Sequence, residues 1–72
     1  MKLREVDPHE PQPGDRVRIY TPIYTDPDHP TNWDEGIVSK NTEMELVLEP
    51  DESFHHAADE AFGSIYYIVE EA

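Results

Sequence analysis

The fold is decided by residues 13–24, which read Pro13-Gly14-Asp15-Arg16-Val17-Arg18-Ile19-Tyr20-Thr21-Pro22-Ile23-Tyr24. The proline, glycine and aspartate at the start are a turn signal. After this turn, apolar Val17 and Ile19 alternate with polar residues, and such a period of two indicates a half-buried β-strand. We therefore expect a strand over Arg16–Tyr24. Pro22 cannot donate to a ladder, so this part of the strand should lie at a sheet edge or a bulge.

The next apolar segments supply partners for this strand. After a long polar loop at Thr25–Glu35, we expect a strand at Gly36–Lys40, a tight turn at Asn41-Thr42 and a strand at Glu43–Glu49. A two-residue connection between two short alternating runs is typical of a β-hairpin. The sequence therefore predicts antiparallel pairing in this half of the chain.

The C-terminal part changes its period. Phe54, Ala57, Ala58, Ala61 and Phe62 recur at the spacing of a helical stripe, which predicts a helix over residues 52–62 that ends at Gly63. Residues 64–70 are rich in β-branched and aromatic residues and predict a last strand. At the other end of the chain, residues 1–15 should form an extended Pro-rich arm, within which Lys2–Val6 could add a short edge strand. Residues 16–72 are then a single small domain.

The strand and helix periods together select one apolar set. These residues should form a single core, because each falls on the inward side of its predicted element. The predicted core consists of Val17, Ile19, Met44, Leu46, Leu48, Phe54, Phe62, Ile65, Tyr67 and Val69.

This order of elements resembles the SH3-like small β-barrel superfamily, which includes KOW and Tudor modules. The residues that carry the resemblance are Pro13, Gly14, Asp15, Val17, Ile19, Gly36, Ile37 and Val38. The resemblance implies a mainly β fold, namely a small SH3-like antiparallel barrel with one short helix before the last strand. The alternative is an α+β fold in which one helix packs on a four-stranded antiparallel sheet. No specific family is indicated, since the Ala-Leu-Tyr-Asp-Tyr-like segment and tandem tryptophan of signalling SH3 domains are absent from the sequence.

The chain is strongly acidic, with 17 aspartates and glutamates against 5 lysines and arginines, which gives a formal net charge of −12. Binding to nucleic acid depends on basic side chains that neutralise phosphates, so we expect no direct nucleic-acid binding and no docking on an anionic membrane. The acidity can serve solubility, adaptation to a salt-rich cytoplasm as in halophiles, or docking on a basic partner protein. Composition alone leaves these three explanations open.

The opening Met1-Lys2-Leu3-Arg4 leads into acidic residues rather than an apolar run. We therefore expect no signal peptide, no membrane span and a cytoplasmic location.

No residue pattern indicates catalysis. The chain has no cysteine, and its serines lack a neighbouring acid–base motif. The loop residues 26–34 offer oxygen ligands, but their spacing lacks the central glycine and terminal glutamate of a calcium loop. His55/Asp59 and His56/Glu60 have the i, i+4 spacing of weak pairs on an exposed helix face. We therefore expect no enzyme, no metal site and no cofactor.

The remaining candidates are aromatic and acidic residues around the long loop. Tryptophan and tyrosine are favoured anchors of protein interfaces, and neighbouring acids suit a basic or proline-rich peptide. The predicted partner-binding residues are Tyr20, Tyr24, Trp33, Asp34 and Glu35. Trp33 can serve in either of two ways, as a lid folded back over one end of the barrel or as an exposed contact residue.

Three function classes follow. The first is a non-enzymatic acidic protein-interaction module, or a small subunit, that docks on a basic partner through this aromatic and acidic loop. The second is a nucleic-acid mimic, such as phage-type inhibitors of DNA-binding proteins, for which the net charge is the support. The third is a metal-responsive regulatory protein that uses His29, His55 or His56. The sequence does not identify the partner, the source or the oligomeric state.

Overall fold

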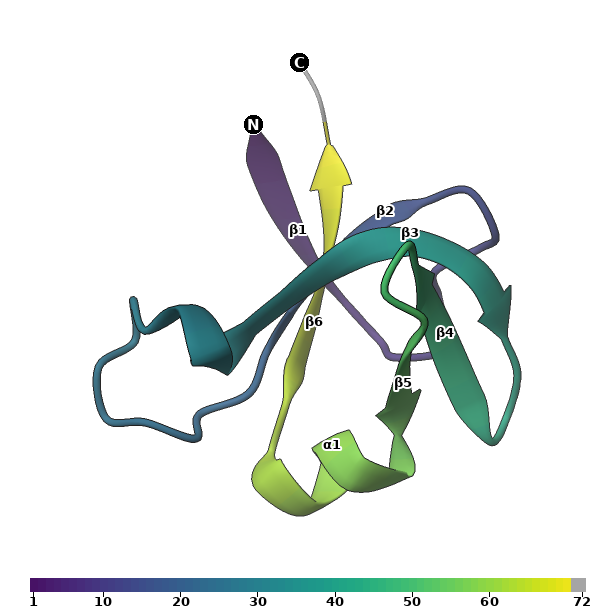
Figure 1. The fold of residues 1–72 in the computed structure, drawn as a ribbon. Helices are drawn as coiled ribbons and strands as arrows, with labels where there is room; N and C mark the ends of the chain where they lie inside the picture. Colours follow the sequence, from purple (N-terminus) through teal and green to yellow (C-terminus); the bar gives the residue numbers. More distant parts are fainter. Residues whose placement is uncertain (71–72) are drawn as a thin grey trace.

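The computed structural model describes residues 1–70, apart from the side chains of residues 57 and 58. Within this range the chain forms a six-stranded antiparallel sheet with one short α-helix before the last strand (Figure 1). The predicted mainly β fold with a short helix at this place is therefore confirmed. The elements in chain order are β1 (Lys2–Val6), β2 (Arg16–Tyr20), the 3₁₀ turn η1 (Pro30–Asn32), β3 (Trp33–Asn41), β4 (Glu45–Glu49), β5 (Ser53–His56), α1 (Ala57–Phe62) and β6 (Ile65–Glu70).

The strands lie in the order β1-β6-β2-β3-β4-β5, so the stretch that decides the fold lies in the interior of the sheet. β2 pairs with β3 on one side and with β6 on the other. Lys2–Val6 is the edge strand that the sequence predicted, and it pairs with β6 alone within the described residues. At the opposite edge lies β5, which pairs with β4.

The turn at Pro13-Gly14-Asp15 directs the chain into β2. Gly14 has a φ of 97°, which a side chain would strain, and its N–H donates to the carbonyl of Val38 at 2.8 Å. Val38 in turn donates to the carbonyl of Asp15 at 2.9 Å. β2 ends at Tyr20 rather than at the predicted Tyr24. The sheet pairing cannot continue through Pro22, which has no N–H.

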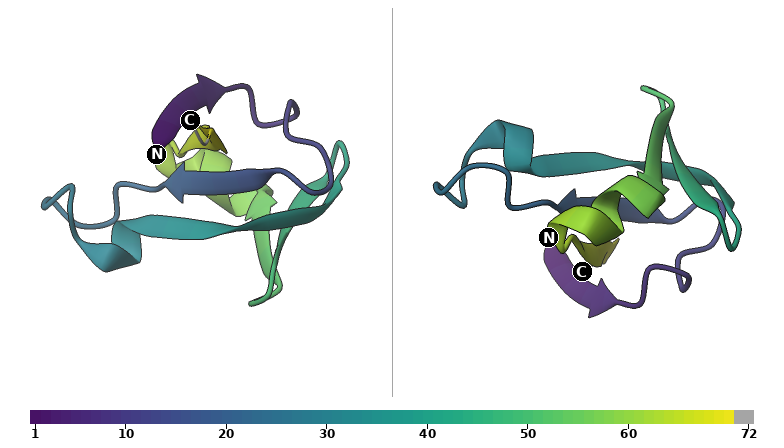
Figure 2. Two further views of the ribbon diagram at one scale, coloured as in Figure 1. Left: turned by 90° about the horizontal axis from the view of Figure 1, so that it is seen from above. Right: turned by 90° about the horizontal axis from the view of Figure 1, so that it is seen from below.

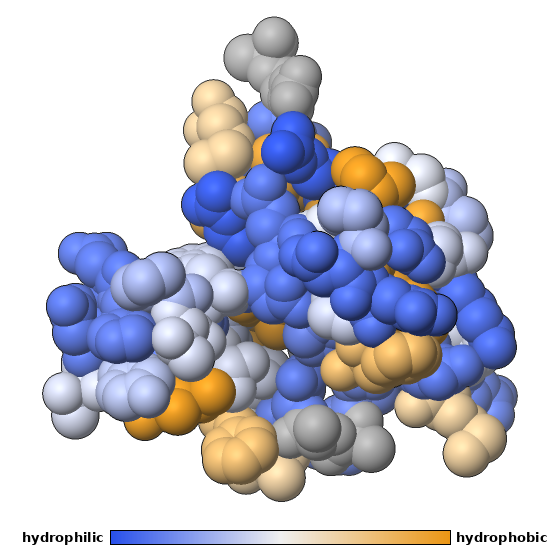
Figure 3. All heavy atoms as spheres, viewed as in Figure 1, coloured by the Kyte–Doolittle hydropathy of each residue, from blue (hydrophilic) through white to orange (hydrophobic). Residues whose placement is uncertain are grey.

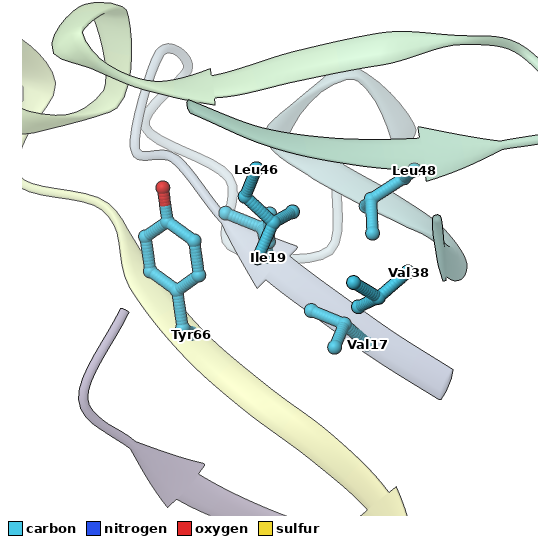
Figure 4. Packing of buried hydrophobic residues seen from close by; sticks show 6 residues of the cluster. All are labelled: Val17, Ile19, Val38, Leu46, Leu48 and Tyr66. Carbon is cyan, nitrogen blue, oxygen red and sulfur yellow. The ribbon is translucent and has the colours of Figure 1, made fainter. Parts of the chain in front are cut away.

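The main core lies on one face of the bent sheet. Its members come from four strands and are all at most 3 % exposed (Figure 4), and they are Val17, Ile19, Val38, Leu46, Leu48 and Tyr66. Gly36 permits the close packing of β3 on β4, because a Cβ there would lie 2.6 Å from the carbonyl oxygen of Glu49. β3 and β4 can therefore approach this closely at residue 36 only because glycine has no side chain.

The helix predicted over residues 52–62 is wrong in its first half. Residues 53–56 form β5, in register with β4 from Leu48↔Ser53 to Glu45↔His56. The helix begins only at Ala57, and it ends as predicted at Gly63, which has a φ of 70°. The apolar spacing suggested one long helix, but strand pairing with β4 and the contacts of His55 with Asp34 and Asp59 favour a strand over residues 53–56.

Three predicted core residues are exposed instead, and the error in the helix accounts for two of them, Phe54 and Phe62. Met44, Phe54 and Phe62 are 83 %, 58 % and 59 % exposed. Met44 lies in the turn before β4, which begins at Glu45 rather than at residue 43. Phe54 and Phe62 belong to different elements and share no helical stripe.

The two tyrosines of β6 face the opposite way from the prediction, which placed Tyr67 in the core. Tyr66 is 3 % exposed and belongs to the main core, whereas Tyr67 lies partly buried on the other face. Val69 is buried as predicted but stands outside the main core cluster.

Candidate interaction surface

Three aromatic rings lie on the face of the sheet opposite the main core. Tyr20 and Trp33 are a cross-strand pair of β2 and β3, with ring centroids 4.9 Å apart. Tyr67 of β6 lies 6.1 Å from the Trp33 ring. β3 begins at Trp33, and the strand register therefore fixes the place of this ring. We call Tyr20, Trp33 and Tyr67 the aromatic face.

An ion-pair network borders the aromatic face. Arg18 donates to Oε1 of Glu35 through Nε at 2.8 Å and through Nη2 at 2.7 Å. Arg16 contributes a third contact, from Nη2 to Oε2 of Glu35 at 3.0 Å. The Arg18 guanidinium also lies 5.7 Å from the centroid of the Trp33 ring, within reach of a cation–π contact. The hydrogen bond from Arg18 holds the pKa of Glu35 below its usual range, so this carboxylate is ionised at neutral pH.

The loop between β2 and η1 is ordered by one asparagine. Asn32 is 1 % exposed and uses its whole amide. Its Oδ1 accepts from the N–H groups of Ile23 and Tyr24 at 3.1 and 2.8 Å. Its Nδ2 donates to the carbonyls of Tyr24 and Asp26 at 2.9 and 3.0 Å. One buried side chain therefore supplies four hydrogen bonds to a segment that is otherwise polar and rich in proline.

The tip of this loop presents apolar side chains to solvent. Ile23 is 53 % exposed and Tyr24 is 49 % exposed. The Tyr24 ring stacks on His29 at 4.1 Å, which holds it at the surface. The loop stands out beyond the strands in both views of Figure 2, and Figure 3 shows an apolar patch on it among polar side chains. The loop tip is therefore ordered, prominent and partly apolar.

The loop is joined to the aromatic face through Trp33. Its Nε1 donates to the carbonyl of Pro27 at 2.9 Å, so the indole is fixed at the base of the loop. A hollow of about 370 Å³ opens at this junction. Its lining residues are Arg18, Asp28, Trp33, Asp34 and Glu35. We call the loop tip and this hollow together the loop surface.

The structure thus places four of the five predicted residues in or beside the loop surface. Trp33, Asp34 and Glu35 line the hollow, and Tyr24 lies at the loop tip. Tyr20 packs against Trp33 but does not line the hollow. Trp33 itself is partly buried by its neighbours. It is therefore neither a fully buried lid nor a fully exposed ring.

The Asp34 carboxylate also belongs to a second hydrogen-bond network, which includes His55, Asp59 and Tyr66. Oδ2 of Asp34 lies 2.7 Å from Nε2 of His55, and Nδ1 of His55 lies 2.6 Å from Oδ2 of Asp59. The Tyr66 hydroxyl donates to the same oxygen of Asp59 at 2.5 Å. The imidazole of His55 therefore joins β3, β5, α1 and β6. The i, i+4 spacing of His55 and Asp59 was the one sequence signal for this contact, although the pair spans a strand and a helix.

The charges in this network stabilise one another. Burial disfavours the imidazolium of His55, but the hydrogen bonds and charges of Asp59 and Asp34 outweigh it and raise the pKa of His55. Burial also opposes the ionisation of Asp59, and here hydrogen bonds from His55 and Tyr66 outweigh it and lower the pKa. The Tyr66 hydroxyl belongs to the same network, and burial together with its hydrogen bond to Asp59 raises the pKa of Tyr66. The two carboxylates on either side of the His55 imidazole form a structural clamp between strands and helix.

The sequence did not identify Asn32 and Tyr67 as parts of a candidate site. Asn32 was considered only as an oxygen ligand in a calcium-like loop, and its polarity alone gives no sign that it is buried. Tyr67 was assigned to the core, since a tyrosine doublet does not show which ring faces inward. Both assignments depend on contacts with distant strands.

The remaining searches give no further clue to function. Within residues 1–70, no three histidine, aspartate or glutamate side chains are placed to hold a metal ion. In the same range, no helix has the length and apolar character needed to cross a membrane. Comparisons with protein-family models, with curated proteins and with solved structures found no match to this chain.

Proposed function

We propose that this protein is a non-enzymatic interaction module that binds a basic segment of a partner protein through the loop surface. The observation that carries this proposal is the buried amide of Asn32, which fixes a prominent loop by four hydrogen bonds while leaving Ile23 and Tyr24 exposed. An ordered loop loses less conformational entropy on binding than a mobile one, so its apolar tip is preorganised for contact.

The acidity of the chain supports a basic partner. In the hollow, Glu35 is paired with Arg18 and Arg16 and the Asp34 carboxylate is bound to His55, so Asp28 is the lining acid that has no ion pair with another described residue. The whole chain carries a net charge of −12, which attracts a basic surface from a distance and speeds its encounter. An arginine or lysine of the partner would therefore be attracted by the acidic chain as a whole and would meet Asp28 in the hollow that Trp33 also lines.

We also infer that the fold belongs with the SH3-like small barrels. The support is the order of elements, in which a long loop separates the first two central strands, a tight turn follows, and a short helix precedes the last strand. The place of the loop surface, on the long loop after β2, agrees with the use of long loops as contact elements on a rigid sheet.

The proposal is tested by selecting peptides from a random phage-displayed library on the immobilised protein and measuring the affinity of the selected peptides by calorimetry. We expect peptides enriched in lysine and arginine. Tyr24→Ala should weaken their binding at least tenfold, because Tyr24 is an exposed anchor whose ring contacts His29 alone among the rings of the described residues. Trp33→Ala should weaken it further, and circular dichroism checks that the variant remains folded.

The matched control is Phe54→Ala. Phe54 is an aromatic residue of similar exposure, 58 % against 49 % for Tyr24, but it lies on β5 outside the loop surface. Its removal should leave the affinity unchanged. Selected peptides without basic residues, or equal losses in Tyr24→Ala and Phe54→Ala, would contradict the proposal.

A further inference from the structure

A second concave site lies on a different part of the molecule and shares no lining residue with the loop surface. It is a pocket of about 460 Å³, which falls within the range of ~300–1,000 Å³ usual for small-ligand sites. Its walls come from the N-terminal arm, the turn between β3 and β4, and the junction of β5 with α1. Its lining includes His9, Glu43, Met44, His56, Glu60 and Tyr66.

The back of the pocket is formed by rings that the structure holds in place. The His9 and His56 rings lie 4.8 Å apart, and His56 lies 6.0 Å from Tyr66. Figure 4 shows that the Tyr66 hydroxyl points away from its own strand, β6. This hydroxyl accepts a hydrogen bond from the N–H of His56 at 3.1 Å. His56 has a φ of 99°, a left-handed backbone that is rare for a residue with a side chain and that persists only where its surroundings hold it.

Asn41 fixes the arm against this wall. Its Nδ2 donates to the carbonyls of Pro8 and Pro11 at 3.2 and 2.9 Å, so its Oδ1 is left to accept from Nε2 of His56 at 2.9 Å. One amide thereby joins the arm to the His56 ring. The position of the His9 ring against His56 is therefore fixed by contacts of the arm with the sheet.

The mouth of the pocket combines an apolar side chain with negative charge. Met44 is 83 % exposed, and this flexible thioether can adapt its shape to a bound apolar group. Glu43 and Glu60 are exposed at the same mouth, and neither makes an ion pair with another described residue. Lysine and arginine are missing from the lining residues. Burial and the neighbouring His9 lower the pKa of His56, which keeps this ring neutral at neutral pH.

We propose that this pocket binds an organic cation with an apolar body, that is, an amine or guanidine whose carbon skeleton packs on Met44 and the histidine rings while its charge faces Glu43 and Glu60. An anion would face these two carboxylates without a basic partner in the pocket. A neutral apolar molecule would leave the carboxylates unused. The proposal is independent of the loop surface and of its partner.

Two-dimensional NMR of the whole chain tests the proposal with three small probes at about 0.15 M NaCl, where long-range attraction is screened. Phenethylamine carries both the charge and the apolar body, 2-phenylethanol carries the body alone, and methylammonium carries the charge alone. We expect phenethylamine to shift the Met44 methyl and the ring signals of His9 and His56. Its affinity should exceed that of either other probe by at least about tenfold.

Variants locate the site. Met44→Ala and the pair Glu43→Gln with Glu60→Gln should each weaken phenethylamine binding several-fold. All three side chains are exposed, and unchanged signals from the rest of the chain show that the variants remain folded. Glu49→Gln is the matched control, because Glu49 is also an exposed acid but lies on β4 outside the pocket. It should leave the affinity unchanged.

The source of the cation is distinguished by a peptide probe, acetyl-Phe-Lys-amide, which carries an aromatic body and an amine on a polypeptide backbone. Tighter binding of phenethylamine than of the peptide indicates a free small amine, and the reverse indicates a protein side chain; both support the cation site. Three results would overturn it. These are equal affinity for phenethylamine and methylammonium, equal affinity for phenethylamine and 2-phenylethanol, or absence of shifts at the pocket at millimolar probe.

Discussion

Replacement of Asn32 by alanine should release the loop surface from the sheet. The substitution removes four hydrogen bonds, those to the N–H groups of Ile23 and Tyr24 and to the carbonyls of Tyr24 and Asp26. At about 1 kcal/mol net for each hydrogen bond, the loop loses up to about 4 kcal/mol of its stability against local opening. The freed backbone groups can turn to water once the loop opens, so the strands themselves should stay paired.

Native-state hydrogen exchange measures this loss directly. A loss of about 4 kcal/mol corresponds to nearly a thousandfold lower protection, so we expect the Ile23 and Tyr24 amides to exchange between about a hundredfold and a thousandfold faster in Asn32→Ala. The Val38 amide, which is bonded to the carbonyl of Asp15 within the sheet region, should keep its protection. Binding of the basic peptides to the loop surface should weaken in parallel, because the loop would have to be ordered on binding.

Asn32→Asp separates hydrogen bonding from mere filling of space. Aspartate has nearly the same shape and keeps an oxygen for the Ile23 and Tyr24 amides. Its second oxygen, however, would face the carbonyls of Tyr24 and Asp26, with which it cannot form a hydrogen bond while it is ionised. Aspartate should therefore open the loop at least as much as alanine does. Unchanged protection of the loop amides in Asn32→Ala, or full protection in Asn32→Asp, would refute the role that we assign to this amide.

Three further predictions concern the stability of the whole domain. Leu46→Ala should lower the free energy of unfolding by about 2–5 kcal/mol, because Leu46 is fully buried, and a denaturant titration at which the midpoint does not move would place it outside the core. Thermal stability should be highest between about pH 4 and 6.5. The pKa of His55 is raised in the folded protein, so His55 stabilises the fold below its unfolded pKa, and this stabilisation is lost as the pH rises through the folded pKa. The pKa of Asp59 is lowered, so Asp59 stabilises the fold above its unfolded pKa, and this stabilisation is lost as the pH falls through the folded pKa. The pKa of His56 is lowered, so His56 has the opposite effect on the pH dependence. Melting temperatures of the wild type and of His55→Gln across the pH range isolate the contribution of His55. If the loss of stability at alkaline pH is the same in both proteins, His55 does not make this contribution. Added NaCl should raise the melting temperature by screening repulsion within a chain of net charge −12, and a flat or falling trend would show that repulsion does not limit stability.

Local patterns predicted β2 but failed at β5, and the strand predicted at Gly36–Lys40 runs over Trp33–Asn41 in the structure. The alternation in residues 16–20 and the turn at residues 13–15 predicted β2 and its position, because a period of two and a glycine with positive φ are properties of the local chain. Residues 53–56 carry a pattern that suits a helix equally well. Their pairing with β4 and the burial of His55 between Asp34 and Asp59 decide for a strand, and these partners are distant in sequence or lie beyond the segment itself.

The candidate site was predictable in its residue types rather than in its construction. A tryptophan among acidic residues in a long loop pointed to Trp33, Asp34 and Glu35, and these three line one hollow. The two alternatives for Trp33, a lid over the barrel or an exposed contact residue, took no account of Asn32. Its four hydrogen bonds depend on the loop closing back on η1, a condition that no window of the sequence expresses.

The shape of β5 has a consequence for how this molecule behaves when it is crowded. An edge strand offers unpaired backbone groups on which a second chain can grow a fibril. Here the extended template has four residues, and Glu52 with a φ of 53° and His56 with a φ of 99° turn the backbone away at both ends. Glu49, Asp51 and Glu52 add repulsion between copies at the same corner. Phe54 can therefore be exposed to water at high protein concentration without β5 pairing with a strand of a neighbouring molecule.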